Sequence, residues 1–271
     1  MTSYLGKMIM AYDTGIEWCN HTFNPWWGCT KLSQGCKHCY AETMSARFGQ
    51  DIWGPGRQRR TFAEKHWHEP LKWDALAAAT NIRARVFCAS MADVFEDNRQ
   101  LNDERTRLWH LIEETPHLDW LLLTKRPHLI AEMVPSAWLT DPRENVWYGT
   151  SVESPEVYAR LDALRHTPAV VRFVSAEPLL APLTDLDLAG LHWVIAGGES
   201  GSGARPMDEA WVRLIRDQFQ AAGVAFFMKQ MGAVWARTHA AHSKGGNLDD
   251  LPPDLQIREF PQPLRVGTVH V

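Results

Sequence analysis

The sequence predicts an α/β fold, a partial or closed (β/α) barrel of six to eight mostly parallel strands. Apolar runs bounded by turn residues recur at spacings too long for hairpins, and amphipathic helical patterns lie between many of them. Runs such as WLLLT, VRFVS and WVIAG are apolar almost throughout, which is typical of parallel strands covered on both faces. A doubly wound open sheet is the alternative arrangement of the same units.

The individual elements follow from these patterns. A first strand is expected around residues 16–23. Further strands are expected at residues 85–89, 120–124, 146–152, 170–175, 193–196 and 225–229. Helices are expected at residues 41–48, 103–114, 155–164 and 208–221. The helix at 155–164 opens with proline in its first turn, where the missing amide hydrogen costs no hydrogen bond.

Composition limits the kinds of partner. The chain has 28 Lys and Arg against 32 Asp and Glu, so its formal charge of -4 over 271 residues makes a surface-wide grip on phosphates improbable. No run reaches the roughly eighteen apolar residues of a membrane helix, and the first residues do not resemble a signal peptide. We therefore expect a cytoplasmic protein without a membrane partner. Its five cysteines argue for metal ligands or free thiols rather than a disulfide framework.

Two regions are expected along the chain. Residues 1–232 are predicted to form the barrel domain, and residues 233–271 a C-terminal extension packed on it. Within the extension, residues 247–263 are rich in proline and acidic residues, which is typical of a loop or tail over one barrel end.

Polar residues collect where the apolar runs end. These groups are Ser90 and Asp93, Lys125 and Arg126, Ser151 and Glu153, Ser175 and Glu177, Gly197 to Glu199, and Lys229 and Gln230. Because the C-terminal strand ends of parallel α/β folds surround the site, we expect a shared polar cavity. The alternatives are that strand ends simply emerge into solvent, that the lysines pair with Glu177 or Glu199, and that Asp93 caps a turn.

A cysteine loop (residues 26–40) follows the first expected strand. Cys29, Cys36 and Cys39 have the spacing C-x6-C-x2-C, which supplies three thiolates to one metal centre. A structural zinc site needs four protein ligands and would have to recruit His38, His21 or Cys19. An iron–sulfur cluster held by three cysteines leaves one iron for an outside ligand. Both metals, and unmetallated thiols, remain open on these grounds, and Cys88 is expected in the core.

The three-cysteine loop resembles the signature of the radical S-adenosylmethionine (SAM) superfamily, although the usual spacing is C-x3-C-x2-C. More closely, the chain resembles a phage-associated three-cysteine-motif family of unknown function. The blocks that carry this resemblance run from about residue 15 to about residue 235 and are NPWWGCTKLSQGCKHCYAE, VFCASMADVF, LLLTKRP, VWYGTSVES, RFVSAEPLL, WVIAGGESGSGARPMD and FFMKQMG.

The resemblance implies a radical-SAM-like barrel with a 4Fe-4S cluster on Cys29, Cys36 and Cys39 and SAM at the open iron. His38 occupies the place where the superfamily usually has an aromatic residue beside the adenine. The superfamily's Gly-Gly-Glu segment lies at an early strand, whereas Gly197, Gly198 and Glu199 come late here. The residues expected to contact the cofactor are His38, Ser90, Lys125, Ser151, Glu177, Gly197, Gly198, Glu199 and Lys229.

Three functions are compatible with the sequence. The first is a radical SAM-type enzyme that cleaves SAM reductively for modification or repair chemistry, with nucleic acid as one candidate substrate and a reductant protein as a partner. The second is a zinc- or cluster-binding module for nucleic acid or protein interaction without radical chemistry. The third is a non-radical barrel enzyme, such as a hydrolase that uses Glu177 and Glu199 as acid and base.

One locally basic stretch bears on the nucleic-acid hypothesis. Residues 57–73 interleave Trp67 and Trp73 with Arg57, Arg59, Arg60, Lys65 and Lys72. Bases stacking on the tryptophans while cations follow the phosphates is one interpretation. The other is an exposed linker whose aromatic residues pack on the barrel.

Overall fold

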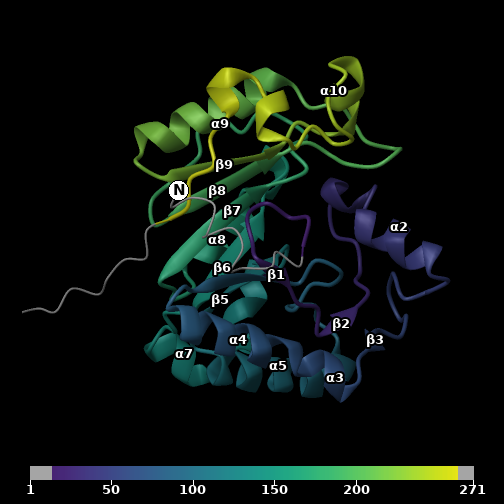
Figure 1. The fold of residues 1–271 in the computed structure, drawn as a ribbon, viewed down its shortest axis with the longest axis vertical. Helices are drawn as coiled ribbons and strands as arrows, with labels where there is room; N and C mark the ends of the chain where they lie inside the picture. Colours follow the sequence, from purple (N-terminus) through teal and green to yellow (C-terminus); the bar gives the residue numbers. More distant parts are fainter. Residues whose placement is uncertain (1–13, 262–271) are drawn as a thin grey trace, which may run out of the picture.

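The computed structural model of the protein describes residues 14–261 (Figure 1). Residues 1–13 and 262–271 belong to the predicted barrel domain and C-terminal extension, and they lie outside the described residues, as does the end of the stretch 247–263.

One parallel sheet forms the centre of the fold. Its seven strands lie in the order of the sequence, and each pairs in parallel with the next. They are β1 (His21–Thr22), β4 (Ala84–Cys88), β5 (Leu118–Thr124), β6 (Val146–Ser151), β7 (Val171–Ala176), β8 (Trp193–Gly197) and β9 (Ala225–Gln230). The sheet curls without pairing β1 to β9, so the predicted α/β barrel is confirmed in its partial form (Figure 1). A doubly wound sheet would require a reversal of strand order, which this sheet lacks.

Helices lie between and after the strands along the chain, and some of them pack on the outer face of the sheet. They are α2 (Tyr40–Arg47), α3 (Glu64–Trp67), α4 (Glu69–Thr80), α5 (Asn102–Glu114), α6 (Ile130–Met133), α7 (Ser136–Thr140), α8 (Ala159–Arg165), α9 (Glu209–Ala221) and α10 (Ala233–Thr238). Helix α4 contacts β4 and β5, α8 contacts β6, and α9 contacts β8 and β9. A small antiparallel pair, β2 (Trp26–Trp27) with β3 (Arg60–Thr61), stands beside the main sheet.

The predicted helices are found with small changes. Asp208 caps α9, since its side chain accepts a hydrogen bond from the Ala210 amide at 2.8 Å. The helix expected at 155–164 is divided into a 3-10 turn, Pro155–Val157, and α8. Helix α4 was not predicted, although its proline near the first position is typical of a helix start.

Because successive side chains of a strand point to opposite faces of the sheet, the buried apolar residues form two separate cores. Residues such as Val86, Cys88 and Trp120 face outward to the helices in the larger core, as expected for Cys88. The inner face of the curled sheet has its own apolar cluster, made of Trp18, Cys19, Phe87, Leu121, Trp147, Val171, Phe173, Trp193, Ile195 and Phe227. This inner plug fills one end of the half-barrel and leaves the C-terminal ends of the strands for polar residues.

The chain after β9 covers the last edge of the sheet. The Met228 amide donates to the Ile257 carbonyl at 2.8 Å and the Glu259 amide donates to the Phe226 carbonyl at 3.0 Å, around an antiparallel bridge between Phe227 and Arg258. This pairing protects the edge of β9. The division into a barrel domain and an extension at residue 233 stays a prediction. Within residues 14–261, no helix has the length and apolarity needed to cross a bilayer.

Candidate functional site

A pocket lies at the C-terminal ends of the strands, beyond the inner plug. Every second residue of a strand faces the inside of the half-barrel. On β5, β6, β7 and β9, the inward-facing residues beyond the plug line the pocket. Thus Lys125 follows Leu123, Ser151 ends β6, Ser175 and Glu177 follow Phe173, and Lys229 follows Phe227. The strand-end residues therefore line one cavity, and they do not simply emerge into solvent.

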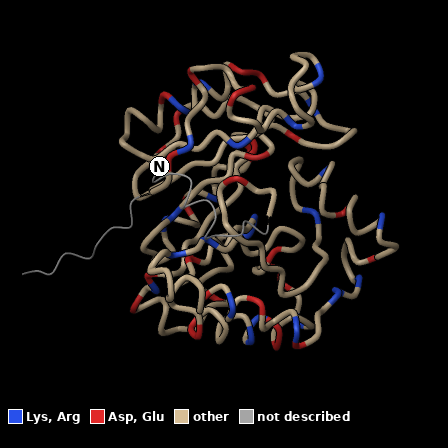
Figure 2. The backbone as a smooth tube through the Cα atoms, viewed as in Figure 1, with Lys and Arg blue, Asp and Glu red and all other residues tan. Residues whose placement is uncertain are grey.

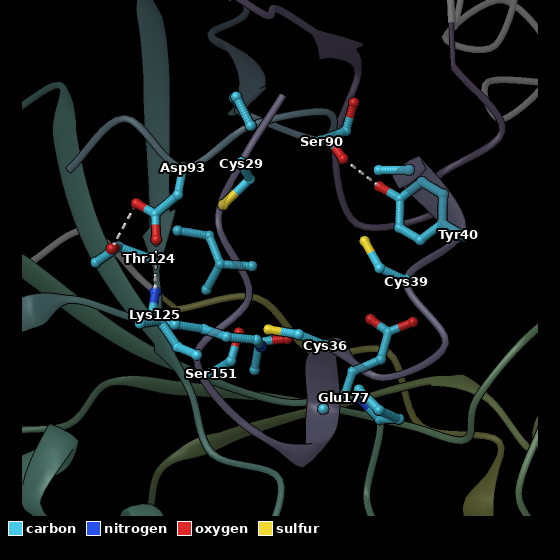
Figure 3. Close-up of a pocket in the computed structure, with 18 of the residues that line it drawn as sticks. Cys29, Cys36, Cys39, Tyr40, Ser90, Asp93, Thr124, Lys125, Ser151 and Glu177 are labelled. Atoms are coloured by element: carbon cyan, nitrogen blue, oxygen red, sulfur yellow. Dashed lines mark hydrogen bonds between the residues drawn. The ribbon is translucent and has the colours of Figure 1, made fainter. Parts of the chain in front are cut away.

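The cysteine loop forms the opposite wall of this pocket. Cys29, Cys36 and Cys39 all line it, and Figure 3 shows their three sulfurs directed into the same space. Cys36 ends a 3-10 turn, Gln34–Cys36, and Cys39 immediately precedes α2. Burial raises the pKa of Cys29 to about 12 and also raises the pKa of Cys39. Both thiols thus stay protonated unless a cation binds them.

The first anchor of the loop is an ion pair at the end of β5. Arg126 donates to Asp93 at 2.7 Å, to the Thr30 carbonyl at 2.9 Å and to the Cys29 sulfur at 3.8 Å. Asp93 also accepts from the Thr124 hydroxyl at 2.7 Å and from the Phe95 amide at 3.0 Å. Asp93 therefore caps a turn, as one interpretation of the sequence had it, and also holds the charge that positions the loop.

The second anchor is Glu153, whose side chain is fully buried. It accepts hydrogen bonds from the Ser33 hydroxyl and from Arg160 at 2.8 Å, and Lys125 lies 3.9 Å away. Burial alone would raise its pKa, but Lys125, Ser33 and Arg160 outweigh that effect and lower it. A side chain at Gly35 would come within 2.8 Å of the Glu153 carboxylate, so this loop position needs glycine.

The third anchor is Glu199, at the end of β8. Arg205 donates to both of its oxygens, at 2.9 and 2.6 Å, and His38 lies 3.2 Å from it. Arg205 also donates to the Gln34 carbonyl at 3.0 Å. Burial alone would raise the pKa of Glu199, but the hydrogen bonds and charge of Arg205, together with His38, outweigh that effect and lower it. Glu199 thus holds the loop through Arg205 and His38.

The fourth anchor joins the end of the loop to the segment after β4. The Tyr40 hydroxyl donates to the Ser90 carbonyl at 2.7 Å (Figure 3). Buried Arg59 donates to the Thr30 hydroxyl at 2.9 Å and pairs with Glu96. The loop is therefore fixed from several strand ends.

The pocket also contains an internal ion pair. Lys229 and Glu177 lie 2.5 Å apart, with side chains only 12% and 19% exposed. The expected pairing of a lysine with Glu177 is thus found for Lys229, while Lys125 faces Glu153 instead.

Gly198, directly after β8, has a packing role. A side chain at Gly198 would lie 2.3 Å from the Met231 carbonyl, whereas one at Gly197 would make ordinary contacts. The backbone that approaches Gly198 is thus the chain after β9. Gly198 lines the pocket, but Gly197 and His38 are not among its lining residues.

The donor set can be compared with the two metals considered. Within residues 14–261, no three His, Cys, Asp or Glu side chains are placed to coordinate a single ion. Of the additional zinc ligands considered, Cys19 lies in the inner plug, His21 stacks on Trp73 at 4.3 Å, and His38 bonds to Glu199. The three cysteines line one cavity, and three thiolates are a donor set that a 4Fe-4S cluster can use, because each thiolate binds its own iron.

The interpretation that residues 57–73 bind nucleic acid is wrong for two of the residues on which it rests, Trp67 and Arg59. Trp67 is 2% exposed and packs on Phe23, and Arg59 is 5% exposed and paired with Glu96. Trp73 stacks on His21. Figure 2 shows Lys and Arg interspersed with Asp and Glu along the backbone, as the net charge suggested.

Several residues that hold the loop were not predicted from the sequence, among them Tyr40 and Arg205. Tyr40 carried a signal, an aromatic residue directly after Cys39, but nothing local indicated a partner 50 residues away. Arg205 carried none, because its link to the Gln34 carbonyl spans 171 residues.

The chain matches a protein family. A family model described as "Protein of unknown function (DUF5131)" matches residues 13–254. The chain belongs to this family. The expected membership in a family of unknown function is therefore confirmed.

Two solved structures of spore photoproduct lyase mutants are similar to the chain. One of them has bound AdoMet and a dinucleoside spore photoproduct. Each is 13% identical, has a TM-score of 0.45, and matches 77% of this chain. The chain covers 63% of the length of either structure. No curated protein matches the sequence.

Proposed function

We propose that this chain is a radical SAM-type enzyme that binds a 4Fe-4S cluster through Cys29, Cys36 and Cys39 and binds SAM beside it. The observation that supports this most is that the three cysteines of one loop face a pocket built from the strand ends. The other two cysteines, Cys19 and Cys88, are buried in the inner plug and the outer core. Three cysteine ligands leave one iron for an outside ligand.

The pocket residues suit the polar groups of SAM. Lys125 presents a cation to a carboxylate, and Glu177 presents a carboxylate to an ammonium or to ribose hydroxyls. Ser151 and Ser175 supply hydroxyls, and Ser90, Gly198, Glu199 and Lys229 complete this proposed contact set, with His38 and Gly197 behind the lining. The inner plug closes the far end of the half-barrel to water.

A 4Fe-4S cluster held by Cys29, Cys36 and Cys39 would supply the electron for reductive cleavage of SAM. The chain's own residues hold the loop, orient the cofactor and exclude solvent. We propose modification or repair chemistry on a substrate that enters at the pocket mouth, with nucleic acid as the first class to test and a reductant protein as the electron source.

Anaerobic purification followed by iron, sulfide and zinc analysis tests the metal. We expect about four irons per chain, lost on Cys29→Ala, Cys36→Ala or Cys39→Ala. The matched controls Cys19→Ala and Cys88→Ala remove the two other thiols and should retain the iron. With dithionite and SAM, the loaded protein should release 5′-deoxyadenosine. Zinc without iron, or a loaded protein that never consumes SAM, contradicts the proposal.

A further inference from the structure

Arg126 is placed to act on the proposed metal centre. Its side chain is 8% exposed, and one guanidinium nitrogen lies 2.7 Å from Asp93 and 3.8 Å from the Cys29 sulfur. Among the hydrogen bonds of residues 14–261, no other Lys or Arg reaches the sulfur of Cys29, Cys36 or Cys39. Among the described residues, Arg126 is therefore the cation in direct contact with a cysteine sulfur, and it contacts Cys29 only.

The guanidinium is held rigidly. Its second terminal nitrogen donates to the Thr30 carbonyl at 2.9 Å, which lies in the cysteine loop itself. Asp93 is fixed in turn by the Thr124 hydroxyl at 2.7 Å, the Phe95 amide at 3.0 Å and the Lys125 amide at 3.2 Å. These bonds come from the cysteine loop, the end of β5 and the turn after β4, and they hold both charged groups in place beside the loop.

From this arrangement we infer that Arg126 and Asp93 set the reduction potential of the cluster, with opposite signs. The inference rests on the proposed function for the presence of the cluster. One-electron reduction, with dithionite as the reductant, adds one negative charge to the thiolate-bound centre. A buried guanidinium beside a ligand sulfur stabilises the reduced form and raises the potential, and a buried carboxylate nearby stabilises the oxidised form and lowers it. Arg126 is thus a positioning residue that also biases the electron transfer.

The opposite directions of the two expected shifts distinguish an effect on the potential from simple support of the loop. Loss of support would lower cluster occupancy in both Arg126→Gln and Asp93→Asn, with no reason for opposite changes in potential. Electrostatic tuning predicts that Arg126→Gln lowers the midpoint potential and Asp93→Asn raises it. Arg126→Lys keeps the charge but not the two-nitrogen fork, so its potential should fall between those of Arg126→Gln and the wild type.

The experiment is an EPR-monitored redox titration of anaerobically reconstituted protein, with iron and sulfide measured on each sample. Lys37→Gln is the matched control, because Lys37 is an exposed cation of the same loop and is not among the residues that line the pocket. Solvent screening should leave its potential close to that of the wild type.

The outcomes separate the two proposals. A wild-type protein that never holds iron overturns the proposed function and this inference together. A loaded wild type whose Arg126→Gln and Asp93→Asn variants share its potential, or shift in the same direction, overturns the inference alone. If Arg126→Gln does not load, Arg126→Lys and Asp93→Asn decide: the first must lie below the wild type and the second above it.

Discussion

The fully buried Glu153 carboxylate gives the sharpest stability prediction. Glu153→Gln keeps the shape of the side chain and removes its charge. Arg160 and Lys125, whose side chains are 12% and 19% exposed, then lose their shared counter-charge. Breaking a buried pair by removing one partner costs roughly 3 to 5 kcal/mol. Because both cations retain some contact with water, we expect the low end, about 3 kcal/mol of unfolding free energy.

The assay is thermal unfolding followed by tryptophan fluorescence. For a chain of this size, about 3 kcal/mol corresponds to a fall in Tm of roughly 6 to 12 °C. Ser33→Ala is the control, because it removes only the loop hydroxyl that donates to the same carboxylate. It should cost about 1 kcal/mol.

The pH dependence gives a second check. Lys125, Ser33 and Arg160 lower the pKa of Glu153 in the folded protein against the opposing effect of burial. Its contribution is therefore complete above the unfolded glutamate pKa of about 4.3 and is lost as the pH falls through the lower, folded value. The difference between wild type and Glu153→Gln should be full at pH 7 and shrink below about pH 4. A difference under about 0.5 kcal/mol at pH 7, or one that persists unchanged in acid, refutes the reasoning.

Two further changes test the interior of the half-barrel. A side chain at Gly149 would lie 2.3 Å from the Phe173 ring, so Gly149→Ala should lower stability by about 1 to 3 kcal/mol, and Phe173→Leu should partly rescue it in the double variant when Tm is measured. Additive losses would show that the two positions do not share space. For the pocket pair, a double-mutant cycle of Lys229→Met and Glu177→Gln should give a coupling of about 1 to 3 kcal/mol in chemical denaturation, and a coupling near zero would mean that the pair is only incidental.

The strands could be predicted because each is buried on both faces. Seven apolar runs are found in the structure as strands. All six polar strand ends contribute residues to the lining of the pocket, which include Ser90, Lys125, Ser151, Glu177, Glu199 and Lys229. The first strand is the least well defined. Only His21–Thr22 pairs with β4, because Trp18 and Cys19 leave the sheet to fill the inner plug. The pattern of apolar residues indicates which residues are buried, and Trp18 and Cys19 are buried without pairing in the sheet.

The partners of the site residues could not be predicted, because each contact joins distant parts of the chain. Arg126 reaches Cys29 across 97 residues, and Ser33 reaches Glu153 across 120. A charged residue at a strand end shows that a cavity is polar, but it does not show which loop segment it holds. The apparent nucleic-acid stretch at residues 57–73 misled for the same reason, since Arg59 is neutralised by Glu96, 37 residues later.

These contacts also bear on how the metal site is built. In small zinc modules the ligands come together only when the metal binds, so the binding free energy is also the folding free energy. Here the cysteine loop is held by Asp93 with Arg126, by Glu153, by Glu199 with Arg205, and by the Ser90 carbonyl, which accepts from Tyr40 of the loop. A site fixed by its scaffold spends little of the binding free energy on ordering the loop. The barrel contacts, and not a metal, therefore determine where the three sulfurs lie. This arrangement suits the proposed cluster, whose remaining iron would have to meet its ligand in a defined place.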